Sequence, residues 1–236
     1  MRLRIIIFTA ILLLGSLIAG FMINNKKTNE NTLEYREKHN NVLKVINPFD
    51  VNKDLVDDSL QLVRSGHTIS DFKFVNQYGD SITQESLKGQ IYVANYFFTT
   101  CSSICPIMNN QMKRVHDEFL NDDWLMLLSH TVWPEGDSIP RLYDYSLRYE
   151  VESTKWWFVT GTKEHLYETA RQSYLVVPDI SDTNYVHGDE SDFIHTENLV
   201  LVDPDHQIRG MYDGTDPDAV SDLIKDIYDL KREYKF

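Results

Sequence analysis

The feature that most constrains the fold is a buried-strand pattern that runs directly into a pair of cysteines. Residues 91–98, "IYVANYFF", are almost all apolar or aromatic, as in a central strand that is covered on both faces. The only two cysteines of the chain, Cys101 and Cys105, follow this strand, and Pro106 comes next. Proline suits the first position of a helix, where an N–H group would have no acceptor within the helix. The pattern therefore predicts a strand-to-helix junction that carries both thiols.

Strands and helices alternate in the sequence beyond this junction. Residues 125–129 and 156–160 have the apolar composition of buried strands, and helical stretches follow them at residues 139–149 and 163–174. Such an order is typical of βαβ units, whose strands are parallel. We therefore expect an α/β fold with a parallel core.

Two predicted hairpins add antiparallel strands to this core. Residues 69–83 alternate apolar and polar side chains about a turn at Gly79, and residues 198–212 resemble two strands about a turn at Pro204. Asp216, followed by a proline, has the features of a cap at the start of a last helix. The central sheet is therefore expected to be mixed.

The N-terminus has the features of a membrane anchor. Residues 5–23 contain no charged side chain, and a helix of that length reaches about 28 Å, close to the hydrocarbon thickness of a bilayer. A cleaved signal peptide is the alternative, but the small residues around Ala19 form a poor cleavage pattern. We expect a transmembrane anchor at 1–23, a polar tether at 24–65 and a globular domain at 66–236, with that domain outside the cytoplasm.

The net charge argues against nucleic acid as a partner. Lysine and arginine number 23 and aspartate and glutamate 36, which gives a formal charge of −13. A surface of this sign repels phosphate backbones. It keeps the domain soluble and is compatible with handling a cation, but does not by itself indicate one.

The spacing of Cys101 and Cys105 argues against a purely structural disulfide, the ordinary role of a cysteine pair in an exported protein. Closing so small a ring contributes only about 2 kcal/mol of unfolded-state entropy. Residues four apart on a regular helix hold their Cβ atoms about 5–6 Å apart, whereas a disulfide needs roughly 3.5–4.5 Å. We therefore expect the pair to lie partly in a loop, where it can open and close, with helix N–H groups stabilising a thiolate.

Two thiolates also suit a soft metal such as Cu(I) or Zn(II), but leave it under-coordinated. The third ligand is sought among the eight histidines. His195 is the best candidate because it precedes the strand predicted to start near residue 198, at an edge where a loop could face the cysteines. His187, in the same polar loop, is the alternative.

Other side chains that could hold a soft metal are assigned to the core. Met108, Met112 and His116 recur every four residues on the helix behind Pro106, and methionine at helical spacing usually fills a core. His130, which follows the strand at 125–129, is likewise expected to be a hydrogen-bonded structural residue.

The cysteine motif and the distant His-Thr pair together resemble the SCO/SenC family, copper-binding assembly proteins for cytochrome c oxidase. The resemblance runs from about residue 66 to residue 227 and includes "FFTTCSSICP", "TGTKEHLYETARQSY", "FIHTENLVLVDP" and "IRGMYDGTD". It implies a thioredoxin-like fold, a membrane tether, and a copper ion held by Cys101, Cys105 and His195. One departure is Trp133, which stands where the family often has aspartate before a proline, so we assign no function to that loop.

Two other families with this fold fit less well. Thioredoxin-like oxidoreductases carry Cys-x-x-Cys and a proline before the facing strand, whereas three residues separate the cysteines here and His195 precedes Thr196. Peroxiredoxins place threonine or serine three residues before the reactive cysteine and a proline four before that, but Phe98 and Ala94 occupy those positions. Peroxidase activity is therefore not expected.

The resemblance leaves two functions open. The first is a copper chaperone that delivers the ion to the binuclear copper site of cytochrome c oxidase during assembly, with the copper-site subunit as partner and a second copper chaperone as a possible donor. The second is a thiol-disulfide oxidoreductase that reduces the cysteines of that site. Both use Cys101 and Cys105, but only the first needs His195 as a ligand.

Overall fold

The computed structural model describes residues 42–53, 56–151, 155–176 and 196–236. The apolar run at 5–23, residues 24–41 and 54–55 of the predicted tether, His187 and His195 lie outside these residues. The chain divides into two compact units, residues 1–44 and 45–236, and every strand and helix described below belongs to the second. None of the helices in the described ranges is long and apolar enough to cross a membrane.

The core of the second unit is one sheet of seven strands in the order β2-β1-β5-β4-β3-β6-β7. The strands are β1 (Lys73–Asn76), β2 (Ser81–Thr83), β3 (Ile91–Phe97), β4 (Leu125–Thr131), β5 (Trp156–Thr160), β6 (Asn198–Val202) and β7 (Ile208–Asp213). The three central strands β3, β4 and β5 are parallel, and all other neighbours are antiparallel. The predicted mixed sheet with a parallel core is therefore confirmed.

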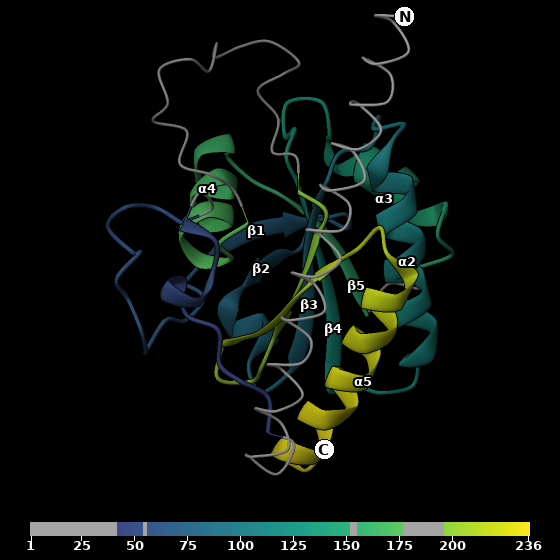
Figure 1. The fold of residues 1–236 in the computed structure, drawn as a ribbon. Coiled ribbons are helices and arrows are strands. Elements are labelled where there is room, and N and C mark those ends of the chain that lie inside the picture. Colours follow the sequence, from purple (N-terminus) through teal and green to yellow (C-terminus); the bar gives the residue numbers. More distant parts are fainter. Residues whose placement is uncertain (1–41, 54–55, 152–154, 177–195) are drawn as a thin grey trace, which may run out of the picture. The chain divides into compact units, whose positions relative to one another are not determined.

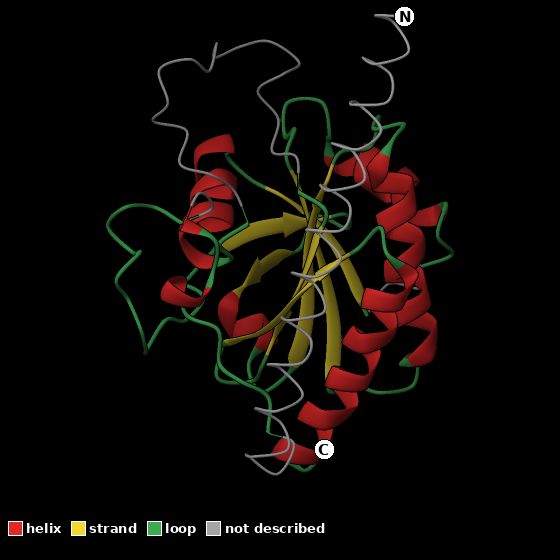
Figure 2. Ribbon diagram, viewed as in Figure 1, coloured by secondary structure: helices red, strands yellow, loops and turns green. Residues whose placement is uncertain are grey.

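Helices cover both faces of this sheet (Figures 1 and 2). The described helices are α2 (Ile104–Glu118), α3 (Ile139–Leu147), α4 (Lys163–Glu168), which continues as the π-helical turn η4 (Thr169–Ser173), and α5 (Pro217–Tyr234), with short 3-10 turns η1 (Pro48–Asp50) and η3 (Gln84–Leu87). Helices α2, α3 and α5 lie on one side and α4 on the other (Figure 1). The sheet is thus the middle layer of three, as in other α/β folds.

Strand β3 is buried on both faces because successive side chains point to opposite sides. Tyr92 and Tyr96 join the apolar core shared with α4. Asn95 and Phe97 face the other way. There the side-chain N–H of Asn95 donates to Oδ1 of Asn109 on α2 at 3.1 Å, and the Tyr145 ring of α3 stacks on Phe97. A strand with both faces covered explains the continuous apolar sequence that precedes the cysteines.

Both predicted hairpins are present. Strand β1 pairs with β2, and Gly79 provides the turn with φ +86°, a conformation that glycine adopts without a steric penalty. Strand β6 pairs with β7. At the edge of the sheet, the N–H of Ile46 donates to the Ile208 carbonyl of β7 at 2.8 Å.

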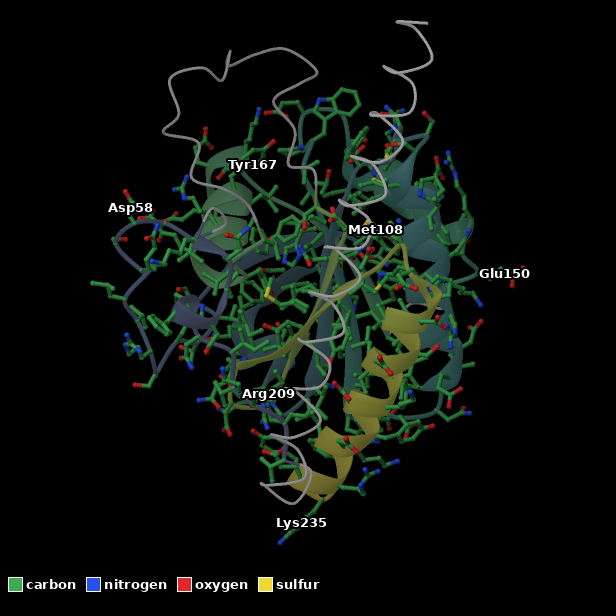
Figure 3. All side chains as sticks on the ribbon, viewed as in Figure 1. Asp58, Met108, Glu150, Tyr167, Arg209 and Lys235 are labelled. Carbon is green, nitrogen blue, oxygen red and sulfur yellow. The ribbon has the colours of Figure 1, made fainter. Side chains whose placement is uncertain are left out.

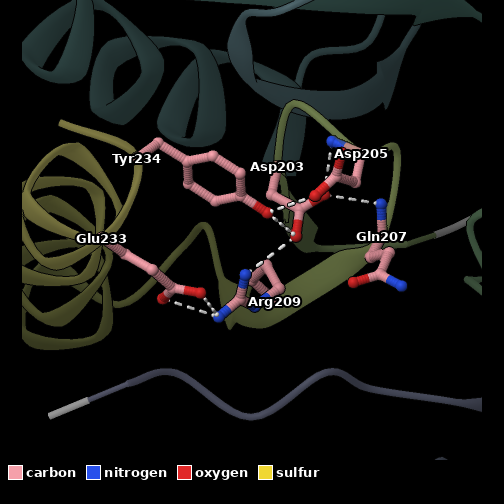
Figure 4. Close-up of polar contacts among 6 residues, drawn as sticks. All are labelled: Asp203, Asp205, Gln207, Arg209, Glu233 and Tyr234. Carbon is pink, nitrogen blue, oxygen red and sulfur yellow. Dashed lines mark hydrogen bonds and ion pairs between the residues drawn. The ribbon is translucent and has the colours of Figure 1, made fainter. Parts of the chain in front are cut away.

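A buried ion network joins the β6–β7 hairpin to the end of α5 (Figure 4). The Arg209 guanidinium donates to Asp203 and to Glu233, both at 2.8 Å, and the Tyr234 hydroxyl donates to Asp203 at 3.0 Å. Asp203 is fully buried. Its ion pair with Arg209 and the hydrogen bond from Tyr234 satisfy a charge that would be costly to bury alone.

Candidate metal and thiol centre

The two cysteines occupy different structural elements. Cys101 lies in the loop that leaves β3, whereas Cys105 is the second residue of α2, which starts at Ile104. The helix therefore begins two residues before Pro106, the predicted first position. Proline is tolerated there because N–H groups throughout the first helical turn lack an acceptor within the helix. The prediction that the pair lies partly in a loop is confirmed.

The sulfur of Cys101 lies against the first turn of α2. The backbone N–H of Cys105 donates to it at 3.4 Å, and the Ser103 hydroxyl is 3.6 Å away. The N–H of Cys101 donates to the Phe98 carbonyl at 3.2 Å, which closes the loop behind the sulfur. Unpaired N–H groups and the positive end of a helix stabilise negative charge on sulfur.

The two thiols differ in exposure and acidity. Cys101 is partly exposed and Cys105 only 4% exposed, and both are free thiols. Partial burial raises the pKa of Cys101, but hydrogen bonds from Cys105 and Ser103 outweigh this effect and leave the pKa below its ordinary value. Burial raises the pKa of Cys105 to about 12. Cys101 is therefore the thiol that ionises first, with Cys105 as a protonated partner beside it.

The loop after β4 contacts the cysteine loop. Asp137 is fully buried and accepts hydrogen bonds from the hydroxyls of Thr99 and Thr131, each at 2.5 Å. Trp133, the family departure, lies over Gly136, where an added Cβ would meet its ring at 2.4 Å. Sequence patterns do not identify Asp137 as part of the site, because nothing local distinguishes a buried aspartate from the exposed ones that usually occupy loops.

The predicted third ligand, His195, and its alternative, His187, both lie outside the described residues. Strand β6 runs antiparallel to β3, with Val200 opposite Ala94, so the start of β6 lies at the sheet edge where β3 ends. Thr196 is buried just before β6, and its hydroxyl accepts the N–H of Asn198 at 3.2 Å. In the part of the chain that the structure describes, no three His, Cys, Asp or Glu side chains gather as a metal site. The complete ligand set therefore stays a prediction.

The side chains assigned to the core do lie there. Met108 and Met112 are buried, Met108 within the interior seen in Figure 3. His116 is 3% exposed, with its Nδ1 atom 3.0 Å from Asp117. His130 is fully buried, its Nδ1 atom lies 3.3 Å from a backbone carbonyl, and burial lowers its pKa to about 3. These residues fill the protein interior, as predicted.

The SCO1/SenC family model matches residues 61–230. The chain belongs to the SCO1/SenC family. A Bacillus subtilis SCO1 protein homolog is 28% identical over 163 residues, which are 68% of this chain and 81% of that protein. A protein of Stutzerimonas stutzeri named for copper binding is 28% identical over 164 residues, which are 69% of this chain and 77% of that protein.

A solved structure shows the same fold. BsSco, described as a member of the Sco family of cytochrome c oxidase assembly proteins with a disulfide switch, superposes with a TM-score of 0.59 at 27% identity. The match covers 70% of this chain and 94% of BsSco. The predicted thioredoxin-like α/β domain of the SCO1/SenC protein is therefore confirmed, whereas the predicted N-terminal helix lies outside the described residues.

Proposed function

We propose that this SCO1/SenC protein binds one copper ion through Cys101, Cys105 and His195 and delivers it to the binuclear copper site of cytochrome c oxidase. The observation that carries the proposal is the pair of sulfurs at the start of α2, one partly exposed and stabilised as thiolate, the other buried. Thiolates are the preferred protein ligands of Cu(I), and a neutral imidazole would complete the ligand set without adding charge.

The unequal environments of the two thiols suit transfer rather than storage. Cys105 is held in α2 and buried, so it serves as the anchoring ligand. Cys101 lies in a loop and is partly exposed, so a thiol of the partner can replace it first. Because the pKa of Cys105 is raised to about 12, its ligation must release a proton at neutral pH, which couples copper binding to pH.

Family membership and sequence support the remaining parts of this proposal. SCO1/SenC relatives include a protein named for copper binding and BsSco, which belongs to a family of cytochrome c oxidase assembly proteins. The apolar run at residues 5–23 would anchor the chain in the membrane with its globular domain outside the cytoplasm. The expected partners are the copper-site subunit of the oxidase and a second copper chaperone as donor.

A thiol-disulfide oxidoreductase remains the second candidate, and the acidity difference favours it specifically. A thiolate at Cys101 could attack a disulfide of the partner, and the Cys105 thiol could then resolve the mixed disulfide. The products are a Cys101–Cys105 disulfide and two reduced cysteines on the partner, so electrons balance. This reaction needs no ligand at residue 195.

The variant His195→Ala separates the two functions, with His187→Ala as a matched control in the same loop. Copper affinity should fall at least about 10-fold in His195→Ala and stay unchanged in His187→Ala. Removing a residue that only supports a metal ligand often lowers metal affinity about 10–100-fold, so removing a ligand itself should lower it at least as much. Competition with a Cu(I) chelator measures both affinities. If His195→Ala binds copper as tightly as the parent while oxidase assembly still requires both cysteines, copper transfer fails as an account and the reductase function replaces it.

A further inference from the structure

The carboxylate of Asp137 is buried in the loop after β4, beside the loop that carries Cys101. Its exposed fraction is 0%, and no lysine or arginine in the described ranges pairs with it. It accepts the Thr99 hydroxyl at 2.5 Å and the Thr99 N–H at 3.2 Å, and it accepts the Thr131 hydroxyl at 2.5 Å. Burying a carboxylate is costly unless hydrogen bonds satisfy it, and such short bonds are typical of a charged acceptor.

These contacts connect three elements at one point. Thr99 follows β3, Thr131 ends β4, and Asp137 immediately precedes the capping residue of α3. The N–H of Asp137 also donates to the Trp133 carbonyl at 2.9 Å, which fixes the loop that carries the carboxylate. We call Asp137, Thr99 and Thr131 the Asp137 brace.

The Asp137 brace supports Cys101, which lies in a loop and not in a helix or strand. Cys105 takes its position from α2, whereas Cys101 lies in the loop two residues beyond Thr99. The Phe97 carbonyl accepts the Val132 N–H at 2.8 Å, so the chain is tied to the loop after β4 both at residue 97 and at residue 99. The position of Cys101 relative to α2 therefore depends on where Asp137 holds Thr99.

We propose that Asp137 is a positioning residue that holds the Cys101 sulfur against the first turn of α2 through Thr99. The brace presents the two sulfurs as a preformed pair, so that little conformational entropy is lost when they bind a metal ion or form a disulfide. Its copper readout rests on the proposed function, whereas its thiol readout does not.

The test compares four variants of the full chain. In Asp137→Asn the amide N–H₂ replaces an acceptor with a donor, and the Thr99 N–H cannot reverse its role. Thr99→Val removes only the hydroxyl, and Thr99→Ser retains it. Asp203→Asn is the matched control, because that carboxylate is equally buried but belongs to the Arg209 network.

Two measurements report on the cysteine pair. The first is Cu(I) affinity from chelator competition. The second is the equilibrium in which the protein dithiol and one glutathione disulfide give the protein disulfide and two glutathione thiols. Both equilibrium constants should fall on the order of 10-fold in Asp137→Asn and Thr99→Val, as expected when the support of a ligand is removed. Thr99→Ser should restore both values, and Asp203→Asn should lower only the urea midpoint of unfolding.

The outcomes separate this inference from the proposed function. If the parent binds no copper, the proposed function fails, and the glutathione equilibrium alone decides on the brace. If Asp137→Asn and Thr99→Val keep the parental glutathione equilibrium, or Asp203→Asn shifts it equally, Asp137 only stabilises the fold and the inference is overturned. Should Asp137→Asn not fold, Thr99→Val and Thr99→Ser give the same comparison.

Discussion

At the scale of single residues, the site depends on two chemically identical side chains in different environments. The N–H of Cys105 donates to the Cys101 sulfur at 3.4 Å, while Cys105 itself is 4% exposed. Helix N–H groups favour the charged form of one thiol, and burial favours the neutral form of the other. The motif therefore contains one nucleophile and one protected partner at neutral pH.

This difference predicts selective alkylation. During brief treatment of the reduced protein with iodoacetamide at pH 7.5, Cys101 should be modified at least about 10-fold faster than Cys105, because the thiolate is the reactive form. The pKa of Cys101 lies below its ordinary value and that of Cys105 at about 12. Fragment-ion mass spectrometry assigns the modified residue. Equal labelling of the two cysteines in the folded protein would contradict the assigned acidities.

At the scale of elements, a buried, neutral histidine on β4 makes the free energy of unfolding depend on pH. His130 is fully buried between aromatic rings, with Tyr96 stacked on it at a centroid distance of 4.8 Å. Burial lowers its pKa to about 3, whereas an unfolded chain protonates histidine near pH 6.5. Between these values the unfolded state binds more protons, so the free energy of unfolding falls as pH decreases from about 6.5 towards 3.

Replacing this histidine should flatten the pH dependence. Between pH 6.5 and 5.0 the parent should lose up to about 2 kcal/mol through His130, at 1.36 kcal/mol per pH unit. His130→Gln should be less stable at pH 7 but lose less stability over the same interval. Urea unfolding at both pH values measures the two differences. The same loss in parent and variant would show that His130 does not contribute.

Helices and strands were predictable from the sequence where the pattern of apolar residues and the residue types in the turns indicated the same structure. The strand at 91–98 and the hairpin about Gly79 follow from apolar composition and from a residue that tolerates positive φ. Tertiary contacts were not predictable. The burial of Asp137 depends on donors from two other elements, and the Ile46–Ile208 bridge depends on where β7 ends the sheet. The position of residue 195 relative to the cysteines stays a prediction.

At the scale of the whole molecule, the proposed function combines a globular domain with a membrane anchor. The seven-stranded mixed sheet belongs to a compact unit at residues 45–236, whereas residues 5–23 have the length and composition of a spanning segment. Attachment would keep the cysteine pair close to a membrane-embedded partner and raise its effective concentration there.

Membrane attachment has a direct biochemical test. The full-length chain should remain in the membrane fraction after washing with high salt and alkaline carbonate, because a spanning helix is held by apolar burial rather than by charge. Immunoblotting of pellet and supernatant measures the partition, and a version starting at residue 42 is the soluble control. Full-length protein in the carbonate supernatant would exclude the anchor.

The central claim is that the reduced pair of Cys101 and Cys105 binds copper. Its most direct test is the copper stoichiometry of the full chain, purified anaerobically in detergent and divided into dithiol and disulfide forms. The dithiol form should hold one Cu(I) per chain and the disulfide form none, because thiolate is the soft-metal ligand and the disulfide removes both. A disulfide form that retains one tightly bound copper per chain, or a dithiol form that binds none, would contradict the account.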